Sequence, residues 1–292
     1  MVDSASTTVR TFGDFSGVLR EVDDRIAFFE SDDGRQAVDA ELARAVRGID
    51  FVSVDVFDTV VLRRPVSELR RFYEWGKAVA EHVADGAVTG EDVVVARLGS
   101  ARAAYRMERA SSDGRLEDIV RATLAMIGVR ADRLEKAIAI ELAHEGERHT
   151  HPNRALWTNL VEHVEAGKQV VLFSDMYMSA DQVRAILEHH GLVEPGIAIH
   201  TSADLPVSKA AGTAFAWMEE ELGADPVRSL HIGDHRIGDF VRPIERGWRA
   251  RLWPLADAHQ AAVLRDQREA YREITAAGAE IPAGWGPRVE EE

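Results

Sequence analysis

The chain has no cysteine, few prolines and no long apolar run. The absence of cysteine in its 292 residues excludes disulfide bonds, thiolate metal ligands and a cysteine nucleophile, and it leaves the redox compartment open. No stretch approaches the roughly 18 apolar residues that span a bilayer, and the first ten residues lack the apolar core of a signal peptide. We therefore expect a cytoplasmic protein with no membrane partner.

Positive charge is also scarce, with 35 Lys and Arg side chains against 50 Asp and Glu and a formal net charge of -15. Such a charge disfavours binding to nucleic acid or to anionic membrane surfaces. An acidic protein that handles anions needs local positive charge, for example from a metal ion. With 46% hydrophobic residues the chain is expected to be globular, and the composition leaves a homo-oligomer open.

Residues 51–61 are the most informative stretch. An apolar, β-branched run breaks at Asp55, and Asp58 and Thr59 follow shortly after. This pattern predicts a buried strand that ends in a polar loop. Because open α/β sheets bind ligands beyond the carboxyl ends of their strands, Asp55 is the candidate nucleophile. The alternative is that Asp55 and Asp58 only form a polar turn.

The periodicity of the chain changes twice. Residues 1–50 predict an N-terminal helical extension without visible chemistry, and residues 62–167 have helical spacing almost throughout. From residue 168 to 277, short apolar strands alternate with helices, which predicts a parallel sheet that also contains residues 51–55. We therefore expect an α/β fold with a helical insertion, followed by a mobile tail at 278–292.

Polar residues follow the predicted strands in an order that suits phosphoryl transfer. Asp55, Ser174 and Asp234 each end a strand, Lys209 begins a predicted helix, and Asp239 lies five residues after Asp234. A carboxylate that attacks a phosphate dianion needs a hard cation with oxygen ligands between the two. The Ser174 hydroxyl and nearby N–H groups could hold phosphoryl oxygens, and Lys209 adds positive charge. Each residue alone has a plainer explanation, as a surface lysine or a turn.

These motifs, taken together, resemble those of the haloacid dehalogenase superfamily, whose members are mostly phosphatases. The first motif is residues 55–59, the second 171–174, the third 207–209, and the fourth 230–234 with Asp239 after it. The resemblance spans about residues 51 to 253, and the order, spacing and strand context all agree.

The resemblance implies a Rossmann-like core (51–61 and 168–277) and a helical cap at 62–167 that closes over the substrate. It implies an aspartyl-phosphate on Asp55 and a bound Mg²⁺ ion. The implied metal ligands are Asp55, the backbone carbonyl of Phe57 and Asp234, supported by Asp239, and the candidate phosphate-binding residues are Thr59, Ser174, Asp175 and Lys209.

One position departs from the pattern. Phosphatases of this superfamily usually carry a second aspartate two residues after the nucleophile, where it acts as general acid, and here that position is Phe57. Loss of a general acid typically costs about 10² to 10⁴ in rate. Asp58 is one residue further on, and alternation along the chain points it elsewhere. Asp175 is the candidate replacement, and its alternative is an N-terminal cap for the next helix.

Three functions therefore stay open. The first is a Mg²⁺-dependent phosphatase of a small phosphorylated metabolite, and a resemblance to a hydrolase subgroup associated with glycosyltransferase-rich gene neighbourhoods favours a sugar phosphate. The second is cleavage of a C–P or C–halogen bond, or phosphoryl transfer to another acceptor. A phosphonatase needs a cap lysine, for which the cap offers only Lys77 and Lys136. The third is a phosphate-binding regulatory protein with little turnover.

Two arginines stand between the first motif and the insertion. Arg63 and Arg64 precede Pro65 and could reach an anionic group, although connecting segments usually run over the surface. The favoured interpretation is therefore an exposed linker pair whose removal leaves KM unchanged.

Overall fold

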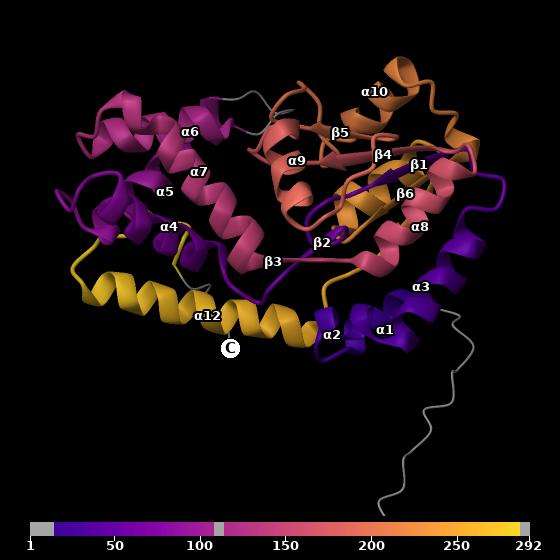
Figure 1. Cartoon of the computed structure of the whole chain (residues 1–292), viewed down its shortest axis with the longest axis horizontal. Helices are drawn as coiled ribbons and strands as arrows, with labels where there is room; N and C mark the ends of the chain where they lie inside the picture. The colour runs from indigo at the N-terminus through magenta and orange to yellow at the C-terminus, as the bar shows by residue number, and fades with distance from the viewer. Residues whose placement is uncertain (1–14, 108–113, 287–292) are drawn as a thin grey trace, which may run out of the picture.

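The computed structural model describes residues 15–107 and 114–286 (Figure 1). The polar first residues and the end of the predicted tail lie outside this part. The α-helices are α1 (Phe15–Glu21), α2 (Arg25–Glu30), α3 (Asp32–Ala45), α4 (Glu68–His82), α5 (Gly90–Met107), α6 (Leu116–Met126), α7 (Leu134–His144), α8 (Arg154–Glu165), α9 (Ala180–His189), α10 (Thr213–Glu221), α11 (Arg242–Glu245) and α12 (Asp257–Ala276). The strands are β1 (Phe51–Val54), β2 (Val61–Arg63), β3 (Thr150–Pro152), β4 (Gln169–Ser174), β5 (Ile197–Thr201), β6 (Ser229–Gly233) and β7 (Arg249–Leu252). Short 3-10 turns η1 (Ala131–Arg133) and η3 (Pro226–Arg228) and π-helical turns η2 (Glu145–His149) and η4 (Arg236–Val241) complete the elements.

A five-stranded parallel sheet forms the core, with strand order β5-β4-β1-β6-β7. The central strand β1 pairs with β4 on one side and β6 on the other, so that Val54 lies opposite both Leu172 and Ile232. The chain builds outward from β1 through β4 to β5, and then crosses to β6 and β7. The carboxyl ends of β1, β4 and β6 therefore meet at the switch point of the sheet, where α/β proteins bind ligands. This confirms the predicted α/β fold.

The sheet is covered on both faces, which explains why its strands are continuous apolar runs. Successive side chains of a strand point to opposite faces. Val52 and Val54 of β1 join the larger apolar core with helices α3, α8 and α9, whereas Phe51 packs with Phe215 and Trp248 on the other face, under α10. Residues of β1 are buried on both sides.

The helical insertion contains α4, α5, α6 and α7, which pack against one another in sequence order (Figure 1). Its two connections to the core form the short antiparallel sheet β2-β3. Helix α8 lies within the predicted cap limits and packs against α3 of the N-terminal extension and β4 of the core. The predicted domain limits stay predictions. In the structure, the β2-β3 pair joins the helical insertion to the core.

The two ends of the chain also take part in the fold. Helices α1 to α3 pack beside the core, and α12 passes from α1 and α2 along the cap helix α4 (Figure 1). Beyond α12, Trp285 packs against Phe72 of α4 with ring centroids 5.8 Å apart, although residues 278–292 were expected to be a mobile tail. Within residues 15–107 and 114–286, no helix combines the length and the apolar character of a bilayer span.

Candidate active site

The candidate nucleophile Asp55 lies at the carboxyl end of the central strand, directly after Val54. The chain then folds into a compact turn, because the carbonyl of Val56 accepts hydrogen bonds from the N–H groups of Val60 and Val61 at 2.8 and 2.9 Å. Within this turn Asp58 has a φ of 61°, in the left-handed region that non-glycine residues seldom adopt. Such a conformation persists only where its surroundings impose it, and it is commonest at functional sites.

Lys209 joins the nucleophile to a second carboxylate. Its buried ammonium group bonds Asp55 Oδ1 and lies 2.7 Å from Asp239 Oδ1. Although burial opposes ionisation, Asp239 and Asp55 raise the pKa of Lys209 above its ordinary value. Burial raises the pKa of Asp55 to about 7, against the attraction of Lys209. Lys209 precedes α10 by four residues, so it lies on a loop and not at the helix start that the sequence suggested.

Asp239 is held on the π-helical turn η4 by several donors. His235 N donates to its Oδ2 at 2.8 Å, and His231 Nε2 lies 3.0 Å from its Oδ1. Burial disfavours the charged form, but Lys209 and His231 hold the pKa of Asp239 well below its usual range. A β-carbon at Gly233 would lie 2.4 Å from Cγ of Asp239, so only glycine fits at this strand end. His231 was missed by the sequence interpretation, because a histidine inside an apolar strand gives no separate signal.

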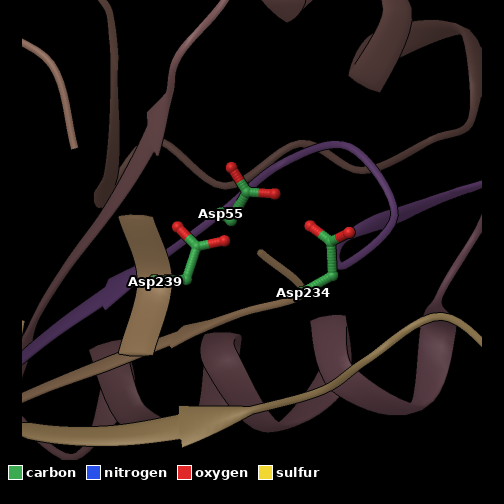
Figure 2. Close-up of side chains that lie close together, drawn as sticks. All are labelled: Asp55, Asp234 and Asp239. Atoms are coloured by element: carbon green, nitrogen blue, oxygen red, sulfur yellow. The ribbon is translucent and has the colours of Figure 1, made fainter. Parts of the chain in front are cut away.

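Three carboxylates converge on one point (Figure 2). Asp55, Asp234 and Asp239 each offer an oxygen, and these oxygens lie within 4.8 Å of one another. Burial first, and then the nearby Asp58 and Asp55, raise the pKa of Asp234 well above its ordinary value. A cluster of buried carboxylates of this kind is relieved by a hard cation, which takes oxygen ligands. The donor set therefore fits Mg²⁺, and the part of the Phe57 carbonyl as a ligand stays a prediction.

The predicted phosphate-binding residues separate into two groups. Ser174 and Asp175 line the cavity with Lys209, whereas the side chain of Thr59 is fully buried and does not reach it. Asp175 accepts hydrogen bonds from the backbone N–H of Lys209 at 2.8 Å and of Ala210 at 2.9 Å. It does not cap the following helix, because Ser179 forms that cap together with Gln182. Asp175 therefore anchors the loop that carries Lys209.

Arg63 lies in the site, whereas Arg64 is exposed as the favoured interpretation predicted for both. The guanidinium carbon of Arg63 lies 4.3 Å from the centre of the Phe57 ring. Its Nε donates to Glu145 at 3.1 Å, and its Nη1 lies 3.3 Å from Asp58 Oδ2. The interpretation of the two arginines as an exposed linker pair is therefore wrong for Arg63. Only the fold reveals the difference, because Arg63 is the last residue of β2 and is held there by Glu145 and Asp58, whereas Arg64 lies beyond the strand.

The N-terminal extension also reaches the site, which the sequence did not indicate. Arg25 of α2 is buried and donates through Nη2 to the carbonyl of Trp253 at 2.9 Å. Burial lowers the pKa of Arg25, and the attraction of Asp58 and Asp234 opposes this change. Arg25 therefore brings a positive charge to the acidic cluster from outside the core.

These residues enclose a cavity of about 340 Å³. Its volume suits a small ligand. Among the described residues, five carboxylates and two cationic side chains line it, so an anionic ligand needs further positive charge. The lining residues are Asp55, Phe57, Asp58, Arg63, Ser174, Asp175, Met176, Lys209, Ala210, Asp234, His235, Gly238 and Asp239.

Solved structures with a similar fold are haloacid dehalogenases and related enzymes. A 2-haloacid dehalogenase from Pseudomonas syringae is 15% identical, with a TM-score of 0.51, over 69% of this chain and 85% of its own. A magnesium complex of an enzyme of the same family from Bacteroides thetaiotaomicron is also 15% identical, with a TM-score of 0.44, over 72% and 96% of the two chains. No protein-family model and no curated protein matches the sequence. The likeness to the Pseudomonas structure shows the haloacid dehalogenase fold, as the four motifs predicted.

Proposed function

We propose that this chain, which has the haloacid dehalogenase fold, is a Mg²⁺-dependent phosphatase of a small phosphorylated metabolite. One observation carries the proposal: Asp55, bonded to the ammonium group of Lys209, points into the same space as the carboxylates of Asp234 and Asp239. A nucleophile beside a cation site matches what a carboxylate needs to attack a phosphate dianion. The fold alone does not decide between phosphatase and dehalogenase.

Different residues of the chain have different roles in the proposed reaction. Lys209 favours the ionised form of Asp55 and orients it through a direct bond, so that a carboxylate oxygen can attack phosphorus. The bond from Asp55 oxygen to phosphorus forms as the bond to the leaving oxygen breaks, and the product is an aspartyl-phosphate. Water then attacks phosphorus, which restores the carboxylate and releases phosphate. Ser174, at the end of β4, would hold phosphoryl oxygens.

Asp55 and Asp234 would hold the metal ion, and Asp239 would support it. When bound, Mg²⁺ supplies positive charge where the nucleophile and the phosphate would otherwise repel each other. The lining of the cavity suits a cation, because five carboxylates and two cationic side chains of the described residues line it. A dehalogenase of this fold needs no metal, so the acidic cluster favours phosphate chemistry.

The proposal predicts that turnover depends on Asp55 and on a divalent cation. Phosphate esters, with sugar phosphates included, and chloropropionate would be assayed in MgCl₂ and in EDTA. We expect Asp55→Asn to lower kcat by at least about 10⁴ on phosphate esters, because it removes the nucleophile and keeps the shape. The variant should remain folded by circular dichroism.

Other outcomes identify the alternatives. Metal-independent release of chloride would assign dehalogenation. Tight phosphate binding without turnover on any ester would assign a binding protein, in line with Phe57 at the position of the usual acid. Wild-type rates in Asp55→Asn, purified free of host phosphatases, would refute the covalent mechanism.

A further inference from the structure

We propose that Arg63 binds a second anionic group of the substrate, so that the substrate is a small phosphate ester whose leaving portion carries its own negative charge. This inference rests on the proposed function and names the class of ester. Arg63 and Lys209 are the two cationic side chains that line the cavity among the described residues. Lys209 is already bonded to Asp55 and Asp239.

Arg63 is oriented before any ligand arrives. Glu145 accepts from its Nε, Asp58 faces its Nη1, and the Phe57 ring supports the plane of the guanidinium group. Its side chain is 24% exposed, so it is partly removed from water but open to the cavity. A guanidinium held on three sides loses little conformational entropy when it binds an anion, which favours affinity.

The guanidinium also has donors to spare. Arginine carries five N–H donors. Its hydrogen bonds to the described residues use Nε and Nη1, and Nη2 has no acceptor among residues 15–107 and 114–286. An unused donor on a fixed, charged group that lines a cavity is available to a carboxylate or phosphate oxygen.

A second guanidinium group balances the carboxylates around Arg63. Glu145 is shared with Arg71, whose Nη1 donates to the same Oε1 at 3.0 Å. The cluster therefore holds two carboxylates, Asp58 and Glu145, against two guanidinium groups. Although burial opposes it, Glu145 and Asp58 raise the pKa of Arg63 further, so the group stays charged.

The two cations contact different residues of the nucleophile segment, and this separates their tasks. Lys209 comes from the loop before α10 and bonds Asp55 itself, next to Ser174 and the phosphoryl site. Arg63 comes from β2 and covers Phe57, two residues beyond Asp55. A substrate whose phosphoryl group meets Lys209 can place a second anion against Arg63, within a cavity of about 340 Å³.

The test compares two esters that differ in one charge. Phosphoglycerate carries a carboxylate where glycerol phosphate carries a hydroxymethyl group. We expect the wild type to prefer phosphoglycerate in kcat/KM by about 10- to 100-fold, the worth of a charged hydrogen bond. Arg63→Gln should bring this ratio close to one, mainly through KM, and Arg63→Lys should leave it in between. Arg64→Ala is the matched control and should keep the wild-type ratio.

A bisphosphate of the same glycerol skeleton distinguishes a second phosphate from a carboxylate, because the larger preference identifies the group that Arg63 receives. A wild type without preference for either charged ester, or an Arg63→Gln variant that keeps the preference, would overturn the proposal. A purely structural Arg63 would lower Tm in Arg63→Gln and leave the ratio unchanged.

The anion site at Arg63 can be tested even if the proposed phosphatase activity is not found. If no ester is hydrolysed in an Asp55-dependent way, titration calorimetry still tests the anion site. It compares the binding of phosphoglycerate and glycerol phosphate to the wild type and to Arg63→Gln. Tighter binding of phosphoglycerate that is lost in Arg63→Gln supports the anion site, and equal binding of both esters refutes it.

Discussion

Asp175 illustrates how the neighbours of a residue determine its role. As an aspartate directly after Ser174, for which phosphate binding is predicted, it was a candidate acid for the leaving group. In the structure both of its oxygens accept backbone N–H groups, from Lys209 and Ala210. These two hydrogen bonds hold both oxygens against the loop that carries Lys209. These contacts favour a positioning role, in which Asp175 fixes the loop that brings Lys209 to Asp55.

Asp175→Asn tests this role. Asparagine keeps one acceptor oxygen but turns an N–H₂ group toward a backbone N–H, so we expect a loss of roughly 1–3 kcal/mol of stability. kcat/KM should fall by a similar factor for an alkyl phosphate and for nitrophenyl phosphate, because Lys209 is displaced for both. Steady-state kinetics on the two esters measure the loss of kcat/KM, and a melting curve measures the loss of stability. A selective loss on the alkyl ester with unchanged Tm would restore Asp175 as the general acid.

At the scale of elements, helix α12 links the core to the cap. Asp266 accepts from Ser67 N at 2.8 Å and from Ser67 Oγ at 2.6 Å, and Arg70 Nε donates to it at 3.1 Å. Ala270 and Ile274, one and two turns further along α12, are buried against α4. The helix therefore holds the first turn of α4 in place. The cap is attached through α12 as well as through β2 and β3.

Asp266→Ala should loosen this attachment. It removes the acceptor for three donors around the start of α4, and we expect a destabilisation of roughly 1–3 kcal/mol, which lowers Tm by several degrees. Amide hydrogen exchange should speed up in residues 67–72 before it does in the sheet. Glu269→Ala, on an exposed position of the same helix, is the matched control and should change neither. Unchanged exchange at 67–72 in Asp266→Ala would mean that apolar packing alone holds α4.

At the scale of the whole molecule, a chain with a net charge of -15 gathers five carboxylates around one cavity. Burial raises the pKa of Asp55 from 3.8 to about 7. A raised carboxyl pKa stabilises the folded state fully below the unfolded value of 3.8, and this contribution is lost as the pH rises through about 7. Above that pH the ionised site needs a cation.

Mg²⁺ should therefore raise Tm more at about pH 8 than at about pH 5, because protons compete with the cation for the same oxygens. At a concentration of about 100 times Kd the gain is about 2.7 kcal/mol. Melting curves with and without MgCl₂ at both pH values measure it, and Asp234→Asn should abolish the gain. An equal Tm shift at both pH values, or one that survives in Asp234→Asn, would place the cation elsewhere.

The sequence by itself determined the sheet and the candidate nucleophile. Burial on both faces makes β1, β4 and β6 apolar runs, and a parallel sheet brings the residues after these strands, Asp55, Ser174 and Asp234, to one edge. Both signals are local, since they depend on periodicity within a strand and on the residue that ends it. They suffice for the fold and for the acidic cluster.

Only the tertiary structure decided which side chains surround that nucleophile. Arg63 and Arg64 are neighbours in sequence, yet Arg63 meets Glu145, 82 residues away, and lines the cavity while Arg64 faces water. Asp266 meets Ser67 across 199 residues. Contacts at such separations depend on the paths of the loops and on the packing of whole helices, which no local pattern encodes. For that reason the sequence predicted Asp55 and the acidic cluster, and the fold was needed to place Arg63 beside them.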